Sequence, residues 1–212
     1  MLWDTNSTEE LMQKVPFEKP EKQIIVAICG KSASGKDTLA KKLHKYLCKR
    51  GIDTGLIVSD TTRPKRDYEE DGIDYHYIPH MKFLDKQYSG EYLEWAEFKG
   101  WRYGTHKNEI ANAINIGVFN PTGIRKLFKL QKQYTIIPVL LDVGLFTRLK
   151  RSYQRENRWQ WEYLRRAWYD YKDFFAFEDE VSRTKHWLIL NDYETVDAIY
   201  VIKLLLEREG FI

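Results

Sequence analysis

The sequence has little cysteine and no long hydrophobic run. Its 212 residues include two cysteines, Cys29 and Cys48, whose positions show no metal-ligand spacing. We expect both to be ordinary packing thiols in a reducing cytoplasm. No stretch approaches the ~18 apolar residues of a transmembrane helix, and residues 1–21 lack the basic and apolar regions of a secretory signal. The composition therefore predicts a soluble, cytoplasmic protein with no membrane partner.

The chain also lacks a strong excess of charge of either sign. Its 34 basic and 31 acidic residues give a formal net charge of +3, which is too small to indicate general nucleic-acid binding. Residues 148–172 are the exception, with eight Lys and Arg against three Asp and Glu, mixed with aromatic residues. Aromatic and basic mixtures occur in proteins that bind single-stranded nucleic acids. A solvated, charged helix with an aromatic inner face is the simpler interpretation, so we expect no nucleic-acid partner.

Hydrophobic patterning predicts one α/β domain. Residues 24–29 form an uninterrupted apolar run that ends at Gly30, which is typical of a strand buried on both faces of a parallel sheet. Leucines recur four residues apart between 36 and 50, and Gly51 stands where a helix would end. The chain length suits a single core carrying an insertion.

Further apolar segments continue the alternation of strands and helices. We expect strands at 55–58, 116–119, 136–143 and 187–190, with a helix at 194–208 after the last. Pro138 removes a hydrogen-bond donor from its strand and is expected to split or shorten it. Residues 61–105 carry short, aromatic-rich pieces and several glycines, which indicates an insertion of short strands. The pattern predicts a parallel sheet core flanked by helices.

Residues 30–38 read GKSASGKDT and match the phosphate-binding loop G-x-x-x-x-G-K. The motif stands between the first predicted strand and the first predicted helix, as its mechanism requires. Backbone N–H groups of such a loop surround a phosphate, and the lysine reaches the β and γ oxygens of the nucleotide. The residues expected to bind ATP are Gly30, Ser32, Ala33, Ser34, Gly35, Lys36, Asp37 and Thr38.

One position of this loop departs from the usual pattern. Asp37 stands where a Ser or Thr hydroxyl normally binds Mg²⁺, and Thr38 follows it. The Asp37 carboxylate either contacts the magnesium shell or only favours the positive end of the helix, and the sequence leaves both open. We therefore assign Asp37 and Thr38 as candidate magnesium ligands.

The next segment resembles the GMP-binding region of guanylate kinases. It reads SDTTRPKR at 59–66, continues with Glu69, Gly72, Asp74 and Tyr75, and ends with EWAEFKG at 94–100 and YGT at 103–105. The likeness runs from residue 30 to residue 105 and returns in the C-terminal third. It implies an acceptor site for GMP or dGMP. The residues that it assigns to this site are Ser59, Arg63, Arg66, Tyr75, Glu94, Tyr103, Thr105 and Asn120.

The chemistry of these residues suits a nucleoside monophosphate. Arg63 and Arg66 can donate forked hydrogen bonds to phosphate oxygens, and Tyr75 and Tyr103 can donate their hydroxyls to the same group. Glu94 would accept hydrogen bonds from guanine N1–H and the 2-amino group, donors that adenine lacks.

The resemblance also implies a lid and an organisation into parts. Arg155 and Arg166 would be catalytic together with Lys36, closing over both phosphate chains, and Asn191 would contact adenine. Residues 1–22 would be a tail preceding a kinase domain at 23–212. Within that domain the expected parts are a core at 23–58, 107–147 and 176–212, a small mixed α/β GMP-binding subdomain at 59–106, and a helical lid at 148–175.

Two residues depart from the family where a strand is expected to end. The family usually has an acidic pair around one apolar residue, and this chain has Val118, Phe119 and Asn120. The sequence thus indicates a divergent guanylate kinase that uses ATP with Mg²⁺. A deoxynucleoside monophosphate kinase of altered base range is one alternative. A non-catalytic module that binds a phosphorylated partner is another, although such a module has no need of Lys36. The sequence does not indicate an oligomeric state.

Overall fold

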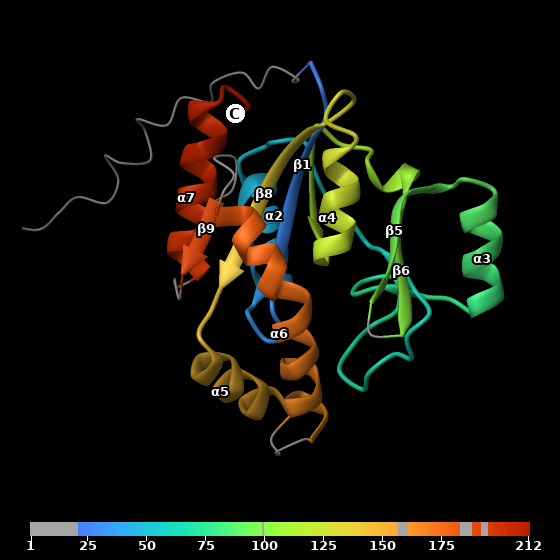
Figure 1. Cartoon of the computed structure of the whole chain (residues 1–212). Coiled ribbons are helices and arrows are strands. Elements are labelled where there is room, and N and C mark those ends of the chain that lie inside the picture. Colours follow the sequence, from blue (N-terminus) through green and yellow to red (C-terminus); the bar gives the residue numbers. More distant parts are fainter. Residues whose placement is uncertain (1–20, 99, 157–160, 183–187, 192–194) are drawn as a thin grey trace, which may run out of the picture.

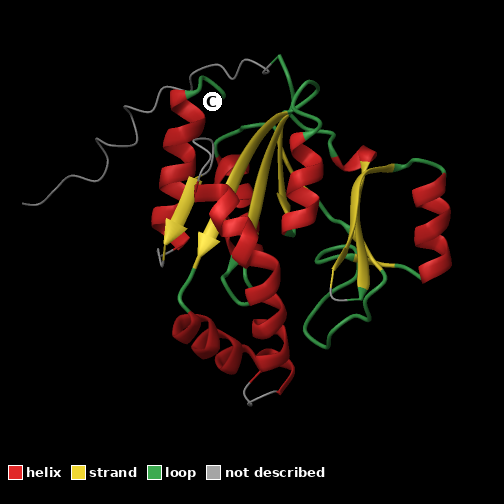
Figure 2. Cartoon of the chain, in the orientation of Figure 1, coloured by secondary structure: helices red, strands yellow, loops and turns green. Residues whose placement is uncertain are grey.

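The computed structural model describes residues 21–98, 100–156, 161–182, 188–191 and 195–212, which form two β-sheets (Figures 1 and 2). The larger sheet is parallel, with the strand order β2-β7-β1-β8-β9. Its strands are β1 (Ile24–Gly30), β2 (Thr54–Leu56), β7 (Ile114–Val118), β8 (Thr135–Asp142) and β9 (Leu188–Asn191). The smaller sheet is mixed, with the order β4-β3-β6-β5. Its strands are β3 (Asp60–Thr61), β4 (His76–Tyr77), β5 (Tyr92–Phe98) and β6 (Trp101–His106).

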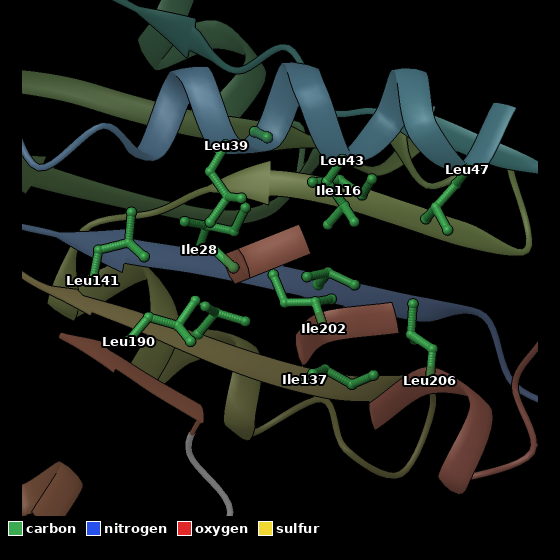
Figure 3. Close-up of a cluster of buried hydrophobic side chains, with 14 of the residues drawn as sticks. Ile28, Leu39, Leu43, Leu47, Ile116, Ile137, Leu141, Leu190, Ile202 and Leu206 are labelled. Atoms are coloured by element: carbon green, nitrogen blue, oxygen red, sulfur yellow. The ribbon is translucent and has the colours of Figure 1, made fainter. Parts of the chain in front are cut away.

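The central strand β1 is buried on both faces. Ile24, Val26 and Ile28 face a hydrophobic cluster that includes α2 (Lys36–Lys49) and α7 (Thr195–Arg208) (Figure 3). The alternate residues Ile25, Ala27 and Cys29 face a second cluster that includes α4 (Pro121–Phe128) and α6 (Trp161–Ser182). The uninterrupted apolar run is therefore explained by two helical layers, because successive side chains of a strand point to opposite faces.

Three short elements complete the described chain. Helix α5 (Leu145–Glu156) follows β8 and lies beyond the carboxyl ends of the parallel strands, beside one end of α6 (Figure 1). Helix α3 (His80–Tyr88) lies against the smaller sheet, into which it buries Phe83. A 3₁₀ turn, Lys107–Glu109, follows β6. None of the helices in these described ranges is long and apolar enough to cross a membrane.

The predicted fold class is confirmed: a parallel sheet lies between helical layers, and a small second sheet is inserted between β2 and β7. The strands and helices expected from the apolar segments are present, with ends shifted by a few residues. Gly51 has φ 75° and donates its N–H to Cys48 O, as expected for a glycine that ends a helix. Helix α3 was not predicted within the insertion of short strands.

Two expectations are wrong. Pro138 neither splits nor shortens its strand, and it pairs with Ala27 inside the eight-residue β8. Pro138 keeps its place in the ladder with β1, and the described pairing of β8 with β9 begins at Val139. Cys48 is exposed and lies 3.7 Å from the ring nitrogens of His44, whereas Cys29 is buried as expected.

The leucine row of α2 gives a test of this core. Leu43 is completely buried against the larger sheet (Figure 3). We expect Leu43→Ala to lower the free energy of unfolding by about 2–5 kcal/mol, because the truncated side chain leaves a cavity. Met81→Ala on α3 is the control, since Met81 is 67% exposed and its truncation should change stability by less than about 0.5 kcal/mol. Urea unfolding followed by circular dichroism measures both, and equal losses would contradict the assigned core.

Candidate functional site

A cavity of about 570 Å³ opens where β1, β7 and β8 end, and it extends to the smaller sheet. Ligands of parallel α/β sheets bind at this edge of the sheet. Most of the candidate residues from the sequence line this one cavity. They are Gly30, Ser32, Ala33, Ser34, Gly35, Lys36, Asp37, Thr38, Ser59, Arg63, Arg66, Tyr75, Glu94, Tyr103 and Asn120. Thr105 is completely buried and touches the site through Glu94.

The loop after β1 follows a path that only small residues allow. A Cβ on Gly30 would come within 2.6 Å of Ser34 Oγ and 2.9 Å of Leu141 O. Gly35 has φ 95°, and Ala33 has φ 62°, a left-handed conformation that is uncommon for a residue with a Cβ. Backbone held in such a region at a cavity wall is typical of a ligand-binding loop.

Helix α2 begins directly after this loop, and no side chain caps its first turn. Uncapped N–H groups and the positive end of the helix dipole favour an anion at this point. Lys36 is half-buried, and Asp37 and Thr38 are exposed beside it. These two residues offer a carboxylate and a hydroxyl, which are hard oxygen donors of the kind Mg²⁺ prefers when phosphates supply other ligands. Asp37 and Thr38 therefore fit a magnesium site, whereas Val118 at the end of β7 offers no ligand.

Three oxygen-bearing side chains form a chain of hydrogen bonds in the cavity wall. Ser59 Oγ lies 3.2 Å from Thr105 Oγ1, which donates to Glu94 Oε1 at 2.8 Å. Glu94 is only 6% exposed, and burial raises its pKa from 4.5 to about 7 despite the hydrogen bond from Thr105. Its other oxygen, Oε2, lies against Gly123, where a Cβ would come within 3.0 Å. The site thus holds a buried carboxyl group whose charge is poorly compensated.

Lys126 lies beside this carboxyl group but bonds to other atoms. Its Nζ lies 3.9 Å from the centre of the Trp95 ring and donates to Trp95 O. Burial lowers the pKa of Lys126, while the charge of Glu94 opposes that change. Lys126 was not singled out from the sequence, because no motif or spacing there indicated that it would lie beside Glu94.

The two arginines expected to bind phosphate are joined by Glu69. Arg63 donates to both carboxylate oxygens of Glu69 at 2.9 Å, and Arg66 donates its Nη1 at 3.0 Å and its backbone N–H at 2.9 Å. Tyr77 donates its hydroxyl to the same carboxylate. Burial acts to raise the pKa of Glu69, but these hydrogen bonds outweigh it and hold the pKa below its usual value. Glu69 therefore fixes both guanidinium groups at the cavity wall.

Aromatic rings surround Arg63. The Tyr75 and Tyr77 rings have their centres 5.5 and 5.6 Å from the guanidinium carbon, within the range of a cation–π contact. The Tyr75 ring also meets Tyr103 edge to face at 5.8 Å.

The sequence motif contains Glu69, but no role was assigned to this residue from the sequence. The three-residue spacing between Arg66 and Glu69 could have indicated this ion pair from the sequence.

Asn120 has a structural task as well as a place in the cavity. Its Oδ1 accepts the Gly123 N–H at 2.8 Å and so caps the N-terminus of α4. The side-chain oxygen is thereby engaged, and the amide NH₂ group is what Asn120 can offer to a ligand. The chain thus has a hydrogen-bond donor where the family pattern leads one to expect a carboxylate.

The predicted lid residues are only partly described. Residues 155 and 166 fall within α5 and α6, and residue 191 ends β9, but the side chains of Arg155, Arg166 and Asn191 lie outside what the structure describes. Other residues of these helices reach the loop after β1, among them Arg151 and Asp170. Arg151 Nη1 donates to Ser34 O at 2.8 Å, and Asp170 accepts the Ser32 N–H at 2.7 Å. Neither contact was predicted.

Comparison with known proteins gives a consistent result. The family model for guanylate kinase matches residues 21–119. The guanylate kinase of Carboxydothermus hydrogenoformans is 31% identical over 165 residues, which cover 71% of this chain and 79% of that protein. The guanylate kinase of Thermotoga maritima is 42% identical over 93 residues, which cover 44% of this chain and 43% of that protein. In four such alignments the chain spans only 43–49% of the length of the curated relative.

A solved structure supports the same fold. The guanylate kinase of Anaplasma phagocytophilum superposes with a TM-score of 0.61 at 19% identity, covering 90% of this chain and 87% of that one. At this identity the likeness concerns the fold alone. The sequence relatives establish the lineage, and the chain belongs to the guanylate kinase family.

Proposed function

We propose that this protein transfers the γ-phosphoryl group of ATP to GMP or dGMP. The observation that carries the proposal is that a phosphate-binding loop with Lys36 and a buried carboxyl group, Glu94, line one cavity. The first suits a nucleoside triphosphate and the second suits a base edge that carries hydrogen-bond donors. Arg63 and Arg66 lie in the same cavity and supply positive charge for the acceptor phosphate.

The reaction requires positioning and charge stabilisation rather than a covalent intermediate. An oxygen of the acceptor phosphate attacks the γ-phosphorus, the bond from that phosphorus to the β–γ bridging oxygen breaks, and ADP leaves. Lys36 would hold the β and γ oxygens, and Arg63 and Arg66, fixed by Glu69, would hold the acceptor phosphate. A magnesium ion held by Asp37 and the donor phosphates would neutralise charge on the transferred group. Arg155 and Arg166 would close over that group, and Asn191 would contact adenine.

A broader base range is the second candidate, and Asn120 favours it. Its oxygen is engaged by Gly123 N, so only its amide N–H groups are available to a base. The amide N–H groups of Asn120 can donate to a hydrogen-bond acceptor on the base, whereas a carboxylate at residue 120 would repel that acceptor.

The first test concerns the donor site. Lys36→Ala should lower kcat by about 100-fold or more with the fold intact, because Lys36 serves the transferred phosphate and no core. Lys42→Ala is the matched control, since Lys42 is exposed on the same helix and lies outside the cavity. A coupled assay of ADP release measures both. Wild-type protein that binds ATP and GMP without turnover would instead favour a non-catalytic module.

The second test concerns the acceptor. GMP or dGMP should be preferred to AMP by up to roughly 10⁴-fold in kcat/KM, because adenine leaves the Glu94 carboxylate facing lone pairs. Glu94→Gln should remove most of the guanine activity, and Asn120→Asp should sharpen the preference for guanine. Glu97→Gln is the control, since Glu97 is exposed on the same strand. A wild-type preference for a pyrimidine monophosphate would contradict the guanine assignment.

The third test uses the burial of Glu94 in the protein without nucleotide. Its folded pKa of about 7 exceeds the ordinary 4.5, so the folded state binds the proton more tightly than the unfolded state does. Stability from this group is therefore complete below pH 4.5 and is lost as the pH rises through 7. Relative to wild type, Glu94→Gln should gain up to about 3 kcal/mol in the free energy of unfolding between pH 4.5 and pH 8. A difference that stays constant with pH would show that Glu94 is not a buried, uncompensated acid.

A further inference from the structure

Two charged residues from α5 and α6 hold both backbone groups of Ser32, in the loop after β1. Asp170 on α6 is 2% exposed and accepts the Ser32 N–H at 2.7 Å. Arg148 on α5 is 6% exposed and donates from Nη1 to Ser32 O at 3.4 Å. Its Nε donates to Val143 O at 2.9 Å, which fixes the guanidinium against the end of β8. Two helices that are more than 100 residues from the loop in sequence thus both contact Ser32.

These two contacts matter because Ser32 is directly followed by Ala33 in the loop. Ala33 has φ 62°, a conformation that its Cβ disfavours. The residue before it, Ser32, accepts a hydrogen bond from Arg148 on its carbonyl, and the residue after it, Ser34, accepts one from Arg151 on its carbonyl. Contacts from α5 therefore fix the peptide that joins Ser32 to Ala33 and the peptide that joins Ser34 to Gly35.

Fixing these carbonyls also orients the N–H groups of the loop. In a trans peptide the C=O and N–H groups point in opposite directions. The N–H groups of Ala33 and Gly35 therefore point away from the arginines, and both residues line the cavity. Within the described part of the chain, neither N–H donates to a backbone or side-chain acceptor. They are donors available to a phosphate chain.

We propose that Asp170 and Arg148 are positioning residues that hold the loop of residues 30–36 in its phosphate-binding conformation. The ligand would be the phosphate chain of a nucleoside triphosphate, so the inference rests on the donor role given to this loop above. The two residues touch the loop backbone and act on the ligand through it.

The alternative is that Asp170 and Arg148 form a buried ion pair that only stabilises the fold. The distances favour the positioning role. Asp170 Oδ2 is 2.7 Å from the loop N–H but 3.8 Å from Arg148 Nη1, beyond hydrogen-bond range. The short contact of the carboxylate goes to the loop, and the guanidinium is near enough to balance its charge.

The test separates positioning from stability by removing both charges together. The double variant Arg148→Met, Asp170→Leu removes both members of this buried pair, so neither charge is left without the other, and it should fold. Calorimetric titration with Mg-ATP and, separately, with GMP measures the two sites. We expect the Kd for ATP to rise at least tenfold while the Kd for GMP changes less than twofold. Glu180→Ala is the control, because it breaks an exposed ion pair of α6 with Arg125 outside the cavity lining, and ATP binding should be unchanged.

Two further variants keep the result decisive. Asp170→Asn retains an acceptor for the Ser32 N–H and should keep the Kd for ATP within about threefold of wild type. Adding Ala33→Gly to the double variant should recover at least threefold in ATP affinity, because glycine adopts a positive φ without strain. Normal ATP binding by the folded double variant, an equal loss of GMP binding, or no recovery with Ala33→Gly would overturn the positioning role. Wild-type protein that fails to bind ATP would overturn the proposed function as well.

Discussion

The double burial of β1 is the constraint on which the site depends. Parallel strands bond to β1 along both of its edges, and helical layers cover both of its faces. The strand therefore has no freedom to shift, and a slip of one residue would exchange its two faces. Because β7 and β8 run in the same direction, their carboxyl ends meet the end of β1 at Gly30. The loop after β1, the Asn120 cap and the start of α5 are placed at one edge for this reason.

Two glutamates near the cavity illustrate how burial separates a structural acid from one suited to a ligand. Glu69 and Glu94 are 8% and 6% exposed, yet their pKa values move in opposite directions. Glu69 accepts hydrogen bonds from two arginines and a tyrosine, so its charge is compensated within the protein. Among the described residues, Glu94 has one side-chain donor, the Thr105 hydroxyl, and the nearby Lys126 donates to Trp95 O instead. Its unmet acceptor capacity is a feature that a guanine edge would satisfy.

The parts of the structure that follow from local pattern were predictable from the sequence. The run at residues 24–29, the leucine row of α2 and the glycine at residue 51 each report a period or a backbone conformation, and each was interpreted correctly. Pro138 was misjudged because the cost of its missing N–H depends on the strands that lie beside it, which is a tertiary fact. Helix α3 was not predicted because only Phe83 of its nine residues is buried, so its sequence shows little apolar periodicity. Cys48 was misjudged because its exposure depends on which face of α2 meets the sheet.

In the candidate site, too, the residues recognised by local spacing were predictable, and those that act through long-range contacts were not. Residues of the two motifs could be singled out because their spacing is itself the signal, and most of them line one cavity. The residues that hold the site in shape were not found, because Arg148 and Asp170 reach Ser32 across sequence separations of 116 and 138 residues. No pattern along the chain reports such a contact. The basic segment at residues 148–172 marked the region, but its charge count did not separate an arginine bonded to the loop from one in solvent.

The substitution of an acidic pair by Val118 and Asn120 has a physical consequence for Glu94. Two carboxylates at the base site would repel one another, and the pKa of one of them would rise further. With Asn120 in place, the α4 cap is kept, and residue 120 adds no acidic charge beside Glu94, whose Oε2 lies against Gly123 of the same cap. Lys126 then lies close enough to favour the ionised form of Glu94 without bonding to it. Under the proposed function, Glu94 would accept the donors of the base, and discrimination among purines would rest on Glu94 and on the donor that Asn120 presents.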